Sequence, residues 1–126
     1  MRPALHRVLR AAALAALVPL NACRRAPDLS GEWTGTYPCC GEETIRIAQA
    51  GDTAIATKVT GDQYMPAGEE TWRANVRTGV GQGRVAGVGF VNPSLVPGRL
   101  EILDRQRIRF AWGDAPTGVE FTRRGR

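Results

Sequence analysis

One lysine is found among basic residues that are otherwise all arginine. Of the 17 lysine and arginine residues, only Lys58 is a lysine, and Asp62 follows it in the turn-rich stretch ATKVTGDQYMPAGEE. Lys58 and nearby backbone amides could bind an anionic or carbonyl group, while Thr60 and Asp62 could accept a hydrogen bond from a donor such as an amide N–H. The alternative is that Lys58 is solvated and that Asp62 supports the turn through its own backbone.

Two adjacent cysteines lie in a second turn, YPCCGEE. Cys39 and Cys40 could form a vicinal disulfide, bridge to another chain, or serve a metal or redox role. A soft metal ion would accept two thiolates, but no third ligand lies near them in the sequence. We therefore expect a possible disulfide between Cys39 and Cys40, no metal site and no cofactor.

The chain has one histidine, His6, and it lies in the N-terminal segment. Once that segment is removed, the chain can build neither a Ser-His-Asp or Cys-His nucleophile pair nor a histidine zinc site. Asp62 with Glu69 or Glu70 could form a carboxylate pair, but the sequence does not fix their separation. We expect a binding module and not an enzyme.

The N-terminal segment has the features of a secretory signal. MRPALHRVLR is basic, AAALAALVPL is apolar and too short to span a bilayer, and Leu20-Asn21-Ala22-Cys23 follows. These four residues resemble the lipobox of bacterial lipoproteins, in which the cysteine is acylated and the signal is cut before it. The resemblance implies a signal peptide over 1–22, lipidation at Cys23 and a lipidated linker over 23–30. An ordinary secretion signal with a chance cysteine is the alternative.

The same resemblance implies a location in the cell. Membrane lipid would be a partner through acylated Cys23, because two or three acyl chains hold a protein at a membrane. Arg24 and Arg25 follow, with no aspartate at the position that usually retains lipoproteins in the inner membrane. We expect the bacterial cell envelope, lipid-anchored at the outer membrane and facing the periplasm.

The net charge of +5 does not indicate a nucleic-acid partner. The signal and both tails carry the excess of arginine, whereas residues 28–122 hold 9 basic and 12 acidic residues. The body is therefore slightly acidic, and we expect no nucleic-acid binding.

The rest of the chain reads as short strands with turn signals every 8 to 12 residues. Ile108, Phe110 and Trp112 alternate with polar or small residues, as half-buried strands do. About eight such strands predict an all-β fold, a small antiparallel up-and-down β-barrel of the calycin-like kind over 31–123, followed by a basic tail at 124–126. A seven-stranded sandwich is the competing architecture. The expected strands are 31–37, 43–49, 52–59, 70–77, 83–90, 97–103, 107–112 and 118–123.

Three tryptophans lie at inward positions of separate predicted strands. Trp33, Trp72 and Trp112 are expected to pack in the core. The alternative is that one of them forms the wall of a pocket for an apolar ligand.

Longer stretches resemble a known family of domains. ATKVTGDQYMPAGEETW, GRVAGVGFVNPSLVPGRLEILDRQRIRFAW and the earlier WTGTY are similar to the C-terminal substrate-binding β-barrel of a human F-box-only protein, a type that binds a D-type cyclin. A related domain occurs in chloroplast EXECUTER proteins. The resemblance runs from about Gly31 to about Thr122 and lacks the long insertion of the human protein. There is no F-box here, so ubiquitin ligation is not implied.

The resemblance implies a binding site at the barrel mouth. In the F-box protein the barrel holds the C-terminal tail of its substrate and also recognises chain ends that carry an amide, and the segment matching TKVTGD lines the pocket. A compact lysine would suit such a tight mouth better than the planar arginine. The implied ligand-binding residues are Lys58, Thr60 and Asp62, with Pro66, Ala67, Gly68 and Phe90 as neighbours.

Two other functions remain open at this point. Gly31-Glu32-Trp33 is similar to the G-x-W signature of lipocalins, which would imply a carrier of an apolar ligand inside the barrel. A structural envelope lipoprotein with no small ligand is the third possibility. The first expectation is an envelope-anchored module that binds a peptide C-terminus or a small polar ligand.

Overall fold

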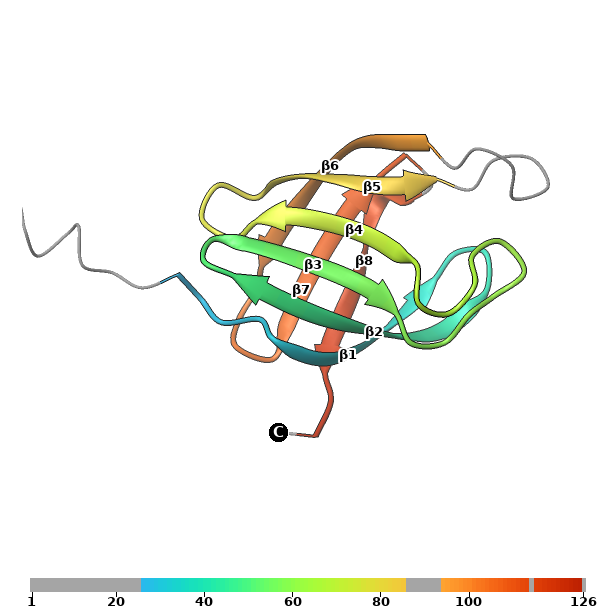
Figure 1. Ribbon diagram of the computed structural model, residues 1–126, viewed down its shortest axis with the longest axis horizontal. Helices are drawn as coiled ribbons and strands as arrows, with labels where there is room; N and C mark the ends of the chain where they lie inside the picture. Colours follow the sequence, from blue (N-terminus) through green and yellow to red (C-terminus); the bar gives the residue numbers. More distant parts are fainter. Residues whose placement is uncertain (1–25, 86–93, 114, 126) are drawn as a thin grey trace, which may run out of the picture.

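The computed structural model describes residues 26–85, 94–113 and 115–125, which form one closed antiparallel β-barrel (Figure 1). Each strand pairs with the next, and β8 pairs back with β1 through Trp33 and Arg123. The predicted small up-and-down barrel is confirmed, and the sandwich alternative is wrong. The strands are β1 (Gly31–Tyr37), β2 (Gly41–Ala50), β3 (Thr53–Lys58), β4 (Glu70–Asn75), β5 (Val80–Val85), β6 (Ser94–Ile102), β7 (Arg107–Trp112) and β8 (Ala115–Arg123).

The predicted boundaries of β1 and β7 are correct, whereas β5, β6 and β8 begin earlier than expected. The glycine-rich start of β5 pairs with β6, Gly81 opposite Gly98 and Gly83 opposite Val96. A Cβ on Gly83 would lie 2.5 Å from Cγ of Trp112, so glycine allows the strand to pass over the indole. Glycines have no side chain to show alternation, which is why the pattern did not reveal the first residues of this strand. The expected continuation to residue 90 lies outside the described residues.

Large aromatic side chains fill the inside of the barrel. Trp72 and Phe110 stack with ring centroids 4.6 Å apart, and Tyr37 meets the edge of Phe121 at 5.9 Å. Trp33 is also fully buried. The expectation that the tryptophans pack in the core is confirmed, since all three are buried. Aromatic pairs in these geometries add to the stabilisation from burial itself, roughly 0.5–1.5 kcal/mol each.

The two ends of the barrel carry different segments of the chain. At one end lie the short turns at 51–52, 76–79 and 103–106 together with both tails, and we call it the closed end. At the other lie the β1–β2 turn at 38–40 and the long β3–β4 loop at 59–69, and we call it the loop end (Figure 1, right).

An apolar plug covers the closed end. Leu29 is buried, its N–H donates to Oε1 of Gln49 at 2.9 Å, and its carbonyl accepts from Nε1 of Trp33 at 2.8 Å. The Arg123 guanidinium stacks over the Trp33 ring at 4.3 Å and donates to the carbonyl of Asp28. The segment before β1 therefore belongs to the fold. No helix in the described part of the chain is long and apolar enough to cross a membrane.

Candidate functional site

Lys58 points into the barrel at the loop end. It continues the inward face of β3 after Ala54 and Ala56, and only 1% of its side chain is exposed. Lys58 is therefore not the solvated side chain of the alternative interpretation. An ammonium group removed from water must be paired, because the cost of burying an isolated charge is several kcal/mol.

Two carboxyl groups and one aromatic ring surround the ammonium of Lys58. Its Nζ donates to Oδ2 of Asp62 at 2.9 Å and to Oε2 of Glu43, and it lies 4.0 Å from the centre of the Tyr37 ring. Glu43 comes from β2, Tyr37 from the end of β1, and Asp62 from the β3–β4 loop. These four residues form what we call the buried ion cluster.

Glu43 is not among the site residues predicted from the sequence, although a signal for it exists. Glu43 falls in phase with Ile45 and Ile47, the inward residues of β2. It is only 4% exposed. A glutamate at an inward position of an amphipathic strand requires a cationic partner, and the only lysine in the chain lies on the neighbouring strand.

Asp62 supports its own turn, as one of the two interpretations expected, and it also pairs with Lys58. Its Oδ1 accepts from the backbone amides of Tyr64 at 2.6 Å and Met65 at 2.8 Å, so it holds the loop, while Oδ2 pairs with Lys58. Burial alone would raise the pKa of Asp62, but hydrogen bonds from Lys58 and the two amides outweigh it, so the pKa lies below its usual value. Burial lowers the pKa of Lys58, against the opposing effect of Asp62.

Four buried polar atoms in or near the ion cluster lack a well-formed hydrogen bond among the described residues, although the hydroxyls of Tyr37 and Thr71 lie close enough to interact with each other. They are Tyr37 Oη, Glu43 Oε1, Thr71 Oγ1 and Trp72 Nε1. Burial, with a smaller contribution from the charge of Asp62, raises the pKa of Tyr37 to about 12 although the nearby Thr71 hydroxyl opposes it. Buried polar atoms are normally paired with protein, water or a ligand. This end of the interior therefore has unused capacity for polar contacts.

A shift in strand register explains why two of these atoms face inward together. The pairing of β3 with β4 shifts between Ala56 and Thr57, and the consecutive residues Thr71 and Trp72 are both buried. Strict alternation would place one of them outside. Irregularities of this kind redirect side chains, and they occur frequently next to functional sites.

An open hollow of about 400 Å³ reaches the ion cluster from outside. Glu43 and Asp62 belong both to the cluster and to the wall of the hollow, and Cys39 and Cys40, joined by a disulfide, form its rim. No lysine or arginine is among the lining residues of the described chain. The lining residues are Cys39, Cys40, Glu42, Glu43, Thr60, Gly61, Asp62 and Gln63.

The other predicted site residues take different places. Thr60 lines the hollow and its Oγ1 accepts from the amide of Thr44 at 2.9 Å, which ties the loop to β2. Pro66, Ala67 and Gly68 are exposed on the outer part of the same loop, and the Gly68 amide donates to the Lys58 carbonyl at 2.9 Å. They support the loop without lining the hollow. Phe90 and Cys23 lie outside the described residues.

The two glutamates considered from the sequence as companions of Asp62 have other surroundings. Glu70 is bound instead by Arg73, with Nε to Oε2 at 2.9 Å, and Glu69 is exposed. The carboxyl group that accompanies Asp62 is that of Glu43.

Comparison with known proteins gives one family. The family model described as cyclin D1 binding domain matches residues 20–123, which include all eight strands. No curated protein matches the chain significantly.

The first prediction concerns the burial of Lys58. Lys58→Met leaves two carboxyl groups in the cluster without their ammonium, so we expect the free energy of unfolding to fall by about 3–5 kcal/mol. Urea denaturation at pH 7 measures this. The matched control is Arg46→Met, which removes the exposed cation of a cross-strand pair with Glu32, and we expect a change of at most about 1 kcal/mol. Equal losses in the two variants would contradict the assignment.

The second prediction concerns the charge on Asp62. Asp62→Asn keeps an oxygen that can accept the two loop amides but removes the charge. Because the folded-state pKa of Asp62 is lowered, the charge stabilises the fold above the unfolded pKa of about 3.9. That stabilisation is lost as the pH falls through the lowered folded-state value. Urea midpoints from about pH 7 to pH 2 should therefore converge for the two proteins in acid, and a gap independent of pH would refute this.

Proposed function

The chain belongs to the cyclin D1 binding domain family, and on this premise we propose that its barrel is a binding module for a peptide C-terminus or a small polar ligand of the same chemistry. The observation that carries the proposal is that two carboxyl groups of the ion cluster line an open hollow, with the buried Oε1 of Glu43 unpaired among the described residues. A ligand entering the hollow meets Glu43 and Asp62 directly.

The charges in the hollow favour a ligand that donates hydrogen bonds. The ammonium of Lys58 is already engaged by two carboxyl groups, and Glu42 adds a third acidic side chain to the wall. With Glu43 and Asp62 both ionised, about one negative charge is uncompensated. At about 6 Å and an effective dielectric constant near 20, it would repel a ligand carboxylate by roughly 3 kcal/mol. A terminal carboxamide offers two N–H donors and no charge.

The interior of the barrel supports this proposal over an apolar carrier. A lipocalin-like carrier needs a chamber along the barrel axis, but Trp72, Phe110 and Phe121 are fully buried there and pack against one another. The polar side chains at the mouth are engaged with one another and with loop amides, Asp62 with Lys58, Tyr64 and Met65. We therefore propose binding without catalysis.

The proposed location rests on the N-terminal sequence. We propose that Cys23 is acylated and anchors the protein in a bacterial envelope, at the outer membrane. Ala26 lies three residues beyond Cys23, at the closed end of the barrel. Three extended residues span at most about 11 Å, so the closed end would face the lipid and the hollow would face away from it.

The third prediction tests the ligand chemistry. A set of short peptides, each with an amidated or a free-carboxylate C-terminus, would be titrated into the Cys23→Ser protein with tryptophan fluorescence as the signal. The repulsion of a carboxylate, roughly 3 kcal/mol, exceeds the about 1.4 kcal/mol that corresponds to a tenfold change in affinity. We therefore expect the amidated forms to bind at least about tenfold more tightly. Asp62→Asn should weaken this binding.

The control for this titration is Asp104→Asn. Asp104 also accepts a backbone amide in a turn and pairs with an arginine, but it lies at the closed end. We expect it to leave the affinity unchanged. Tighter binding of the carboxylate forms, or no binding of either form by natively folded protein, would contradict the proposal.

The fourth prediction tests the anchor. When the chain is expressed in a bacterium with a lipoprotein pathway, we expect the Cys23 form to partition into the detergent phase and the Cys23→Ser form into the aqueous phase. Two or more acyl chains are needed for stable membrane attachment. Identical partitioning of the two forms would rule out acylation at Cys23.

A further inference from the structure

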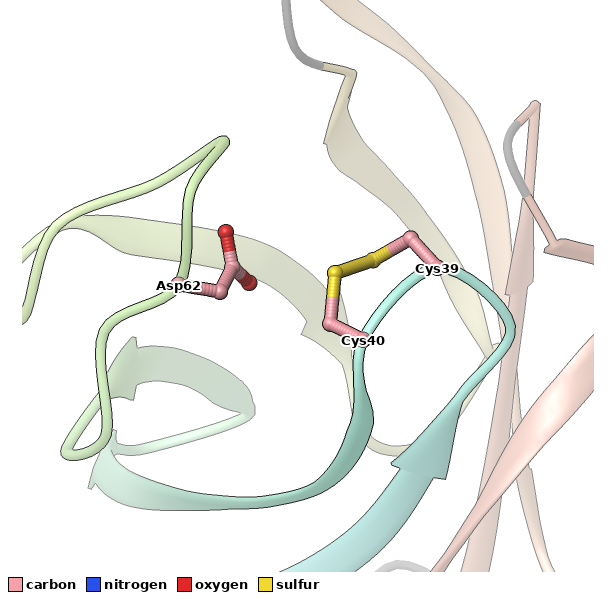
Figure 2. A group of neighbouring side chains, drawn as sticks. All are labelled: Cys39, Cys40 and Asp62. Carbon is pink, nitrogen blue, oxygen red and sulfur yellow. A yellow bond between two sulfur atoms is a disulfide. The ribbon is translucent and has the colours of Figure 1, made fainter.

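We propose that reduction of the Cys39–Cys40 disulfide creates a binding site for a soft or borderline divalent cation such as Zn²⁺, with Cys39, Cys40 and Asp62 as its protein ligands. The two Sγ atoms and a carboxylate oxygen of Asp62 all lie within 4.8 Å of one another. Figure 2 shows the Asp62 side chain directed from the β3–β4 loop toward the disulfide in the β1–β2 turn. This geometry does not depend on the proposed peptide site.

The distances suit a tetrahedral metal site. With Zn–S bonds of about 2.3 Å, two thiolates bound to one ion stand about 3.8 Å apart, and a carboxylate oxygen binds at about 2.0–2.2 Å. Two sulfur ligands and one oxygen ligand leave one position, which water can reach because the site opens into the hollow. The adjacent cysteines lacked a third ligand in the sequence, and the fold supplies it from a different loop.

Asp62 retains capacity for one further interaction. A carboxylate accepts about four hydrogen bonds or equivalent contacts. Asp62 uses one for Lys58 and two for the amides of Tyr64 and Met65. One lone pair remains for a metal ion, so the loop need not unfold for Asp62 to bind it. Glu42 and Glu43 line the same hollow and add to its attraction for a cation.

The disulfide determines when the site can form. In the oxidised state the sulfurs are bonded to each other, and the strong thiolate ligands are absent. A dithiol reductant supplies two electrons and two protons, the S–S bond breaks, two thiols form, and the reductant becomes a disulfide. Binding of the divalent ion then releases the two thiol protons. Cys39 is exposed and so accessible to the reductant.

The fifth prediction measures this site without any peptide ligand. The Cys23→Ser chain has only Cys39 and Cys40 as thiols, because the sequence contains three cysteines. It would be reduced with a water-soluble phosphine, which is oxidised to the phosphine oxide, and desalted without oxygen. Co²⁺ is then added as a spectroscopic probe and displaced by Zn²⁺. We expect a thiolate-to-cobalt charge-transfer band, with one equivalent bound, only in the reduced protein.

Three variants separate the proposed site from simpler possibilities. Cys40→Ser should abolish the band, and Asp62→Asn should weaken Zn²⁺ binding at least about tenfold. Asp104→Asn, at the closed end, should leave binding unchanged, and Mg²⁺ should not compete because thiolates select softer ions. Circular dichroism verifies that each variant is folded.

Some results would overturn the proposal. Equal binding by the oxidised and reduced proteins would show that the thiols are not ligands. An unchanged affinity in folded Asp62→Asn would show a thiol-only site and remove Asp62 from it. The absence of a band in the reduced, folded protein would exclude the site altogether.

Discussion

The burial of one ammonium group constrains the whole loop end of the barrel. Lys58 reaches an interior built from aromatic rings, where an unpaired charge would cost several kcal/mol. Its counter-charges come from two other parts of the chain, Glu43 on β2 and Asp62 on the β3–β4 loop. The loop must fold over the barrel mouth for Asp62 to reach Nζ. This path of the β3–β4 loop forms the hollow, contributes to its acidic lining and brings Asp62 close to the disulfide.

A lysine at position 58 fits the small enclosed space around its charged group. An ammonium is a compact charge with three donors, whereas a guanidinium is a wide planar fork. Two carboxyl groups and the Tyr37 ring, 4.0 Å away, enclose Lys58. The arginines have another role, on the outside of the barrel. Arg46 pairs with Glu32 across β1 and β2, and Arg77 pairs with Asp52 between two turns, both at exposed positions, where each pair contributes about 0–1 kcal/mol.

Alternation of apolar and polar residues was enough to predict the barrel but not all of the site. The pattern gave β1 and β7 correctly because each strand places large apolar residues on one face. The turn-rich stretch and the family resemblance named Lys58 and Asp62 as site residues, but their pairing with each other was not predicted. The paired inward positions of Thr71 and Trp72 could not be predicted, because a register shift breaks the alternation. The proximity of Cys40 to Asp62 depends on how two loops fold against each other, and no sequence spacing encodes it.

The plug at the closed end brings the beginning and the end of the barrel together. Arg123 donates to the carbonyls of Asp28 and Ser30, and the amide of Arg124 donates to the carbonyl of Glu32. The first and last described residues of the chain therefore lie beside the plug, at the end of the barrel opposite the hollow. Both points of attachment to the remaining sequence are thus separated from the ion cluster by the length of the barrel.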